Sequence, residues 1–221
     1  MAALSHSRDP VTTFTIIAAT RLGRATIADA STRRDLANVA TEDGTITTMS
    51  EIAVRVARED EVDKARSILG AAYAEYEGSF PKENWAPYLV DILDLEGRAA
   101  ASELLIAERV GKIVGCVSYF PPGSKASYPS DSFSEPWPTE WAAFRLLAVD
   151  PAARGGGVGR RLTEVCIERA RQQGAPAVGL HTTEPMKVAR AMYERLGFER
   201  APRYDFHPSP QVAVEAYRLD L

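Results

Sequence analysis

The chain has 221 residues, 45% of them hydrophobic and 25% charged, which is typical of one globular domain with or without an appended segment. The net charge of −4 argues against a general nucleic-acid binder, because proteins that follow the phosphate backbone carry a basic excess. No apolar run reaches the roughly 18 residues that a membrane span requires. We therefore expect neither nucleic acid nor a membrane as a partner.

Two cysteines, Cys116 and Cys166, lie in apolar stretches and lack the paired or histidine-associated spacing of a metal site. We expect both to be reduced core residues. The sequence thus predicts no bound metal and a cytoplasmic location.

Residues 1–48 are dominated by small polar side chains, and no helical or strand period persists there. This composition predicts a flexible N-terminal extension, and it leaves open a translation start at Met49. We assign residues 49–221 to a single folded domain.

Alternation of Ile52, Val54 and Val56 predicts a strand at the start of this domain. Helical spacing of apolar residues follows at 62–76 and again at 85–93. Residues 103–120 read as two strands joined by a tight turn at 110–112, where Gly111 can take a positive φ. A loop rich in proline, serine and aromatic residues covers 121–140.

The second half alternates strands and helices. Strands are predicted at 142–149 and 177–183, with helices at 158–170, ended by Gly174, and at 186–196, ended by Gly197. Two further strands are expected at 199–206 and 212–221. The order predicts an α/β (α+β) fold in which helices pack on a mixed, mostly antiparallel sheet.

The segment AVDPAARGGGVGRRL, residues 148–162, joins the central strand to a helix through a glycine-rich turn. A phosphate-binding loop of the Walker type would need Lys-Ser or Lys-Thr where Arg160 and Arg161 stand. A dinucleotide fingerprint fails because Arg160 occupies the third glycine position. What remains is a turn whose main-chain N–H groups meet a helix N-terminus, which suits a diphosphate.

Arg154, Gly157 and Gly159, with the preceding strand LLAVDP and the later segment ARAMYERLGF, resemble the GCN5-related N-acetyltransferases. The resemblance covers about 51–221. It implies the acyl-CoA N-acyltransferase fold, with the sheet splayed between its fourth and fifth strands. It also implies acetyl-CoA as co-substrate and a primary amine of a small molecule or peptide as acceptor, attacked directly in a ternary complex.

The resemblance implies that the diphosphate lies on the glycine turn, that the pantetheine arm pairs with the central strand, and that a backbone N–H near Leu147 stabilises the oxyanion. The expected cofactor-binding residues are Leu147, Ala148, Val149, Arg154, Gly155, Gly156, Gly157, Val158, Gly159 and Arg160.

Tyr193 lies on the inner stripe of the last helix, a position typical of a core residue. The resemblance instead implies that it protonates the leaving thiolate as general acid. The base is left open among Glu140, His181 and a water chain, because Ala143 stands where many relatives carry a glutamate. His181 is also consistent with a purely structural hydrogen bond. Met186 replaces an asparagine that contacts the cofactor arm in relatives.

The resemblance assigns the acceptor site to 73–93 and 121–141, whose aromatic side chains favour a small, partly apolar acceptor, while Glu75, Glu77, Asp131 and Glu135 could hold an ammonium group. Arg145 could bind an acidic acceptor or simply pair with a carboxylate. A non-catalytic acyl-CoA-binding sensor and a nucleotide-binding regulator remain alternatives, and a homodimer is left open.

Overall fold

The computed structural model describes residues 38–40, 46–48, 51–124 and 137–221. The chain divides into two units, residues 1–49 and residues 50–221, one residue beyond the expected boundary. In the first unit, strands β1 (Asn38–Ala40) and β2 (Ile46–Thr48) pair antiparallel. Each of these strands is only three residues long, and the expected flexible N-terminal extension stays a prediction. The predicted flexible segment otherwise lies outside the described residues.

The second unit is built on an eight-stranded sheet in the order β3-β4-β5-β6-β7-β10-β8, with β9 pairing with β10. The strands are β3 Ala53–Val56, β4 Glu103–Arg109, β5 Lys112–Phe120, β6 Ala142–Val149, β7 Ala177–Thr183, β8 Glu199–Arg200, β9 Phe206–Ser209 and β10 Val212–Asp220. Every pairing is antiparallel except that of β6 with β7, which is parallel. The predicted mixed, mostly antiparallel sheet is confirmed.

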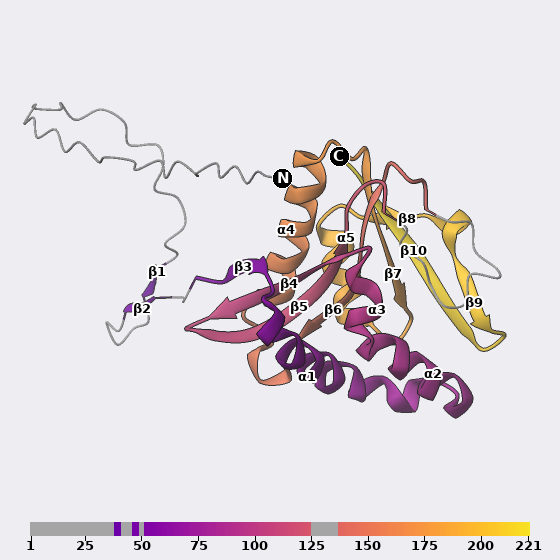
Figure 1. Cartoon of the computed structure of the whole chain (residues 1–221), viewed down its shortest axis with the longest axis horizontal. Coiled ribbons are helices and arrows are strands. Elements are labelled where there is room, and N and C mark those ends of the chain that lie inside the picture. The colour runs from indigo at the N-terminus through magenta and orange to yellow at the C-terminus, as the bar shows by residue number, and fades with distance from the viewer. Residues whose placement is uncertain (1–37, 41–45, 49–50, 125–136) are drawn as a thin grey trace, which may run out of the picture. The chain divides into compact units, whose positions relative to one another are not determined.

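Helices cover both faces of this sheet (Figure 1). They are α1 Val62–Tyr73, α2 Lys82–Leu93, α3 Leu95–Ala99, α4 Val158–Gln172 and α5 Lys187–Arg195. The first three enclose one core cluster, to which α1 contributes Ile68 and α2 contributes Ile92. The last two enclose the other cluster, to which α4 contributes Leu162 and α5 contributes Tyr193. Each of the four helical stripes expected from the 3.6-residue period therefore contributes buried residues to one of the two core clusters.

Turn chemistry explains several element boundaries. Val110 and Gly111 both have positive φ, 51° and 70°, which is the backbone of a two-residue hairpin turn between β4 and β5. Gly174 and Gly197 follow α4 and α5 with φ of 73° and 91°, as expected of helix-ending glycines. Helix α1 ends at Tyr73, and a 3₁₀ segment, η2 (Ala74–Ser79), continues to residue 79.

The single strand expected at 199–206 is wrong. Pro202 opens a 3₁₀ turn, η4 (Pro202–Tyr204), which separates β8 from β9. Proline lacks the N–H that a strand ladder needs, so the pairing stops there. Helix α3 was also not predicted, because five residues are too few to reveal a period.

Strands β6 and β7 pair over only two residue pairs, Ala142 with Val178 and Ala143 with Gly179. Beyond these pairs the two strands separate, which confirms the predicted opening between the fourth and fifth strands of the domain. The paired end is covered by Trp137, since a Cβ added to Gly179 would lie 3.0 Å from its ring. Glycine therefore permits the indole to lie directly on the strand.

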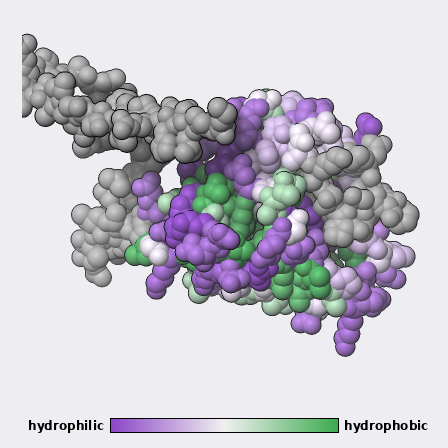
Figure 2. All heavy atoms as spheres, viewed as in Figure 1, coloured by the Kyte–Doolittle hydropathy of each residue, from purple (hydrophilic) through white to green (hydrophobic). Residues whose placement is uncertain are grey.

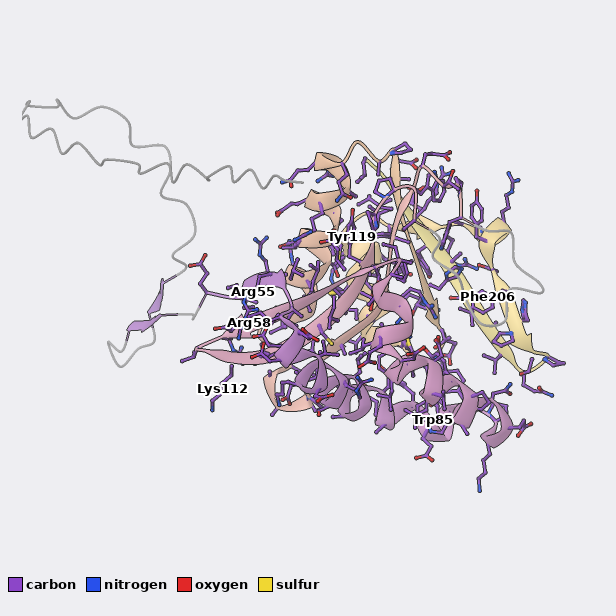
Figure 3. The ribbon with its side chains drawn as sticks, in the orientation of Figure 1. Arg55, Arg58, Trp85, Lys112, Tyr119 and Phe206 are labelled. Atoms are coloured by element: carbon purple, nitrogen blue, oxygen red, sulfur yellow. The ribbon has the colours of Figure 1, made fainter. Side chains whose placement is uncertain are left out.

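The face of the molecule shown in Figure 2 is mostly hydrophilic, with separate apolar patches. Arg55 and Arg58, labelled in Figure 3, both pair with the buried carboxylate of Glu61 at 2.7 Å, beside the start of α1. Among the described residues, no helix combines the length and apolar character needed to span a bilayer.

Candidate functional site

The central strand β6 contains a bulge. Cys116 and Ser118 of β5 are two residues apart, whereas their partners Ala148 and Arg145 are three apart, so β6 carries one extra residue. Leu146, inside the bulge, has a φ of 57° and is buried. A bulge interrupts the ladder and redirects side chains and main-chain groups. The irregular backbone thus lies where β6 has already separated from β7.

The turn after β6 begins with a short 3₁₀ segment, η3 (Pro151–Ala153), and reaches α4 through three glycines. Gly155 and Gly157 have φ of 78° and 80°, a conformation that strains any residue with a Cβ. Gly157 is the N-cap of α4, so the first amides of this helix lack intrahelical partners. Among the described residues, the amides of 155–157 also donate no main-chain hydrogen bond. The turn therefore presents free donors at a positive helix end.

A cavity of about 690 Å³ lies beside this turn. Its walls come from β6, β7, α5, η2 and the start of α4. Of the ten residues predicted to bind the cofactor, all but Gly156 line it. These nine are Leu147, Ala148, Val149, Arg154, Gly155, Gly157, Val158, Gly159 and Arg160. Gly156 instead packs against Arg109, whose guanidinium would lie 2.3 Å from a Cβ at that position.

The two arginines of the turn already have partners. Arg154 forms a two-pronged ion pair with Glu75, at 2.7 and 2.9 Å. Arg160 pairs with Glu164 one helical turn away at 2.8 Å, and its side chain is 67% exposed. Glu75, which the sequence assigned to holding an ammonium group, is thus paired with a cation of this chain.

Tyr193 also lines the large cavity while remaining buried. Its ring packs against Phe144 and Phe198, each with a centroid distance of 5.8 Å. Burial raises the pKa of the phenol well above its usual value, so the hydroxyl stays protonated at neutral pH. The tyrosine therefore combines a core position with access to the cavity, and the two sequence interpretations do not exclude one another.

The structure separates the two side chains considered for the base. His181, on β7, lines the large cavity, whereas Glu140 is exposed in the turn before β6 and is not among the described residues lining either cavity. The Nε2 atom of His181 lies 2.8 Å from the carbonyl oxygen of Tyr204, which can only accept, so Nε2 donates. Burial lowers the pKa of His181 to about 4, so the imidazole is neutral at pH 7.

A second cavity, of about 280 Å³, adjoins the first. It is lined by α2, β6, β7, β9 and β10. The two cavities share Tyr73, Arg145, Leu146, His181, Thr182 and Met186 in their walls. The predicted acceptor segment 73–93 contributes to this cavity, but the second predicted segment, 121–141, contributes no residue that the structure describes.

Sequence reasoning missed the contribution of β9 and β10, which supply Phe206, Pro208, Val212 and Val214. Phe206, on β9, and Trp85, on α2, are labelled in Figure 3. These β residues lie more than a hundred positions from α2 in the sequence, and their strands carry no catalytic motif. Only the antiparallel pairing of β10 with β7 and β9 brings them to the site.

Comparisons with known proteins agree with this geometry. The model of the Acetyltransferase (GNAT) family matches residues 69–198. An IAA acetyltransferase of Azospirillum brasilense is 32% identical over 121 residues, covering 54% of this chain and 70% of the relative. A mycothiol acetyltransferase of Thermomonospora curvata is 32% identical over 97 residues, covering 44% of this chain, and the match spans only 28% of that relative's length.

The fold is shared with the crystal structure of PaiA N-acetyltransferase from Thermoplasma acidophilum in complex with coenzyme A. The TM-score is 0.56 at 12% identity, over 75% of this chain and 98% of the other. This likeness concerns the fold alone, whereas the family match runs from α1 through α5 and includes the glycine turn and Tyr193. The chain belongs to the GNAT family of acetyltransferases.

Proposed function

We propose that this protein transfers the acetyl group of acetyl-CoA to a primary amine of a small molecule. The proposal depends on one observation, the free main-chain amides of the glycine turn and the start of α4 beside a cavity of about 690 Å³. N–H groups at a positive helix end suit a diphosphate, and glycine leaves the approach open. The GNAT relative named above as a coenzyme A complex supports this choice of donor.

The pantetheine arm would lie along β6, where that strand has parted from β7. An arm that carries amide groups can pair with an open strand edge without needing particular side chains. The bulge at Leu146 supports an oxyanion site nearby, because the extra residue frees a main-chain group from the ladder.

In the proposed reaction the amine nitrogen bonds to the acetyl carbon, the carbon–sulfur bond breaks, and the thiolate takes a proton from Tyr193. The nitrogen then releases one proton to water, and the Tyr193 phenolate takes one back from water. The raised pKa of Tyr193 makes this transfer less favourable than for an exposed phenol. The same buried setting raises the pKa of the departing thiol, however, so the two acids stay closer to balance. We therefore retain Tyr193 as the general acid.

His181, with a pKa of about 4, is too weak a base to deprotonate an alkyl ammonium group whose pKa is near 10. We infer that the acceptor reacts as its neutral amine and that its proton passes to water. In this assignment His181 shapes the cavity wall as a neutral imidazole, and Glu140 takes no direct part.

A cytoplasmic location remains part of the proposal. Its support is that Cys116 and Cys166 are free and buried, and that burial raises the pKa of the Cys116 thiol to about 12. Such thiols are unreactive core groups and require no oxidising compartment. A homodimer stays a prediction.

The decisive experiment combines calorimetric titration of acetyl-CoA with an assay of free thiol release over a panel of primary amines. Binding together with amine-dependent thiol release supports the proposal. Binding without release for any amine, amino acid or peptide would instead identify a sensor. Absence of binding to acetyl-CoA, with binding of ATP or NAD, would identify a nucleotide-binding regulator.

A further inference from the structure

The hairpin between β4 and β5 brings an arginine to the glycine turn. Strands β5 and β6 are antiparallel, with Gly115 opposite Val149, so this hairpin and the C-terminal end of β6 lie at the same end of the sheet. The amide of Asp150 also donates to the carbonyl oxygen of Val114 at 2.9 Å. Arg109 is the last residue of β4, so it lies next to the turn that follows β6.

Arg109 and the turn are in close contact. A Cβ built on Gly156 would overlap the Nη1 atom of Arg109. Because a Cβ is one bond of about 1.5 Å from its Cα, this nitrogen lies within about 4 Å of the Cα of Gly156. Gly155 and Gly157 line the large cavity, whereas neither Gly156 nor Arg109 does. The guanidinium therefore approaches the turn from the side that faces away from the cavity.

Arg109 also differs from the arginines of the turn in its ion pairing. Arg154 pairs with Glu75 at 2.7 Å, and Arg160 pairs with Glu164 at 2.8 Å. Arg109 is half-buried, and it has neither an ion pair nor a hydrogen bond with any residue that the structure describes. A positive charge that no carboxylate neutralises thus lies directly behind the free amides of the turn.

The charged groups next to Arg109 in the sequence and in the hairpin do not pair with it. Glu108, which precedes it on β4, pairs with another arginine at 3.0 Å. Lys112, its register partner across the hairpin, is exposed and adds a second positive charge (Figure 3). Asp150, at the start of the turn, accepts a hydrogen bond from the amide of Ala152 at 3.0 Å. The charge of Arg109 is therefore available to attract an anion.

We propose that Arg109 strengthens binding of the acetyl-CoA diphosphate electrostatically, from behind the glycine turn, and that Gly156 is required for its close approach. This inference rests on the proposed acetyltransferase function. The guanidinium adds a full charge to the partial positive charge of the free amides and of the start of α4. Arg109 is thus a positioning residue for the donor, since it acts through the turn and touches no reacting atom.

The proposal also gives a separate reason for each glycine of the turn. Gly155 and Gly157 have positive φ, which a residue with a Cβ adopts only with strain. Gly156 does not have a positive φ, so its backbone would accept alanine. What a side chain at 156 would disturb is the position of the Arg109 guanidinium.

The test is a double-mutant cycle on these two residues, with the dissociation constant of coenzyme A measured by calorimetry at low salt. Arg109→Gln removes the charge, and Gly156→Ala displaces it, because the end of a long side chain can move aside. We expect each variant to weaken binding about three- to fivefold. The double variant should bind no more weakly than Arg109→Gln. Losses that simply add would overturn the inference, because the two residues would then act independently.

Three comparisons separate an electrostatic role from a structural one. Arg109→Lys keeps the charge and should bind coenzyme A more tightly than Arg109→Gln. The loss in Arg109→Gln should shrink at high salt, because salt screens the attraction. Coenzyme A without its 3′-phosphate should show the same loss, since the inference assigns the effect to the diphosphate. A loss that is independent of salt and of the charge at 109, or that requires the 3′-phosphate, would overturn the inference.

The matched control is Arg171→Gln, which removes the same charge from an exposed position of α4, about 21 Å along the helix from Gly157. This variant should bind coenzyme A as the parent protein does. If Arg109→Gln does not fold, Gly156→Ala and Arg109→Lys still test the inference through their affinity and its salt dependence. Binding that Arg109→Gln and Gly156→Ala leave unchanged overturns this inference alone. Absence of coenzyme A binding in the parent protein overturns the proposed function itself.

Discussion

Single side chains in the large cavity serve both the core and the proposed chemistry. Tyr193 packs edge-on against Phe198 and beside Phe144, yet it also lines the cavity proposed for acetyl-CoA. Removing its hydroxyl removes the proposed proton donor and leaves the packing of the ring in place. Substitution at this residue can therefore separate catalysis from folding.

We predict that Tyr193→Phe lowers kcat by about 100-fold or more, because a positioned general acid contributes on that scale. Acetyl-CoA affinity by calorimetry should stay within about twofold. Tyr119→Phe is the matched control: the Tyr119 hydroxyl donates to Gln173 at 2.7 Å, and the residue lines neither cavity. This control should lose about 1 kcal/mol of stability without losing turnover. Unchanged kcat in Tyr193→Phe would remove tyrosine from the mechanism.

Arg154 shows how a neighbouring anion can compete with a ligand. Its guanidinium is held by both oxygens of Glu75, 79 positions away in the sequence, and no local pattern could have predicted that pair. We expect Glu75→Gln to free the guanidinium and tighten acetyl-CoA binding about two- to fivefold at low salt. Glu164→Gln, which releases the exposed Arg160, should have a smaller effect. Weaker binding in Glu75→Gln would show that the ion pair orients Arg154 for the phosphates.

The half-buried His181 predicts a pH dependence of stability. The pKa of His181 is lowered from 6.5 to about 4, so the unfolded chain binds a proton more readily than the folded one. The contribution of neutral His181 to the free energy of unfolding is fully present above pH 6.5. It is lost as the pH falls toward 4, by up to about 3 kcal/mol. Urea titrations between pH 7 and 4 measure this loss, and His181→Gln should flatten it. The lowered pKa of Glu61, about 2, acts in a separate window, below 4.5.

At the scale of elements, the sequence predicted most helices and strands because their apolar periods are long and their ends carry glycine or proline. It did not predict the bulge in β6, since a leucine with positive φ has no signature and Leu146 reads as one more apolar residue. It also missed the β9 and β10 side of the smaller cavity, which depends on pairing between distant strands. The glycine turn could be predicted because its proposed role depends on main-chain conformation and exposed N–H groups. Glycine is the residue type that indicates such a backbone.

The start of α4 offers a test at this scale. Gly157 is the N-cap with a φ of 80°, and a Cβ there would meet nothing within 4 Å, so the cost of Gly157→Ala lies in the backbone conformation alone. We expect the free energy of unfolding to fall by about 1–2 kcal/mol and acetyl-CoA binding to weaken. Gly78→Ala is the control, because its Cβ also meets nothing and its φ is not positive. Equal behaviour of the two variants would contradict the proposed role of the turn.

In the folded unit of residues 50–221, the opening in the sheet lies at its one parallel strand pair, β6 with β7. A single sequence could predict that both faces are covered by helices, and the family resemblance predicted the opening between β6 and β7. It could not predict that Asp91 would serve both Arg98 and Arg145, because packing of α2 and α3 against the central strand creates that cluster.

The two adjoining cavities have a kinetic consequence. In the proposed function the larger cavity holds acetyl-CoA and the smaller one leaves room for the acceptor. Because neither buried cysteine lines either cavity, we expect both reactants to be bound together before any bond changes. Initial rates measured against both concentrations should then give intersecting double-reciprocal lines. Parallel lines would instead indicate that the acetyl group is bound covalently to the protein between two half-reactions. We do not expect this result, because no accessible thiol lies in the wall that the two cavities share.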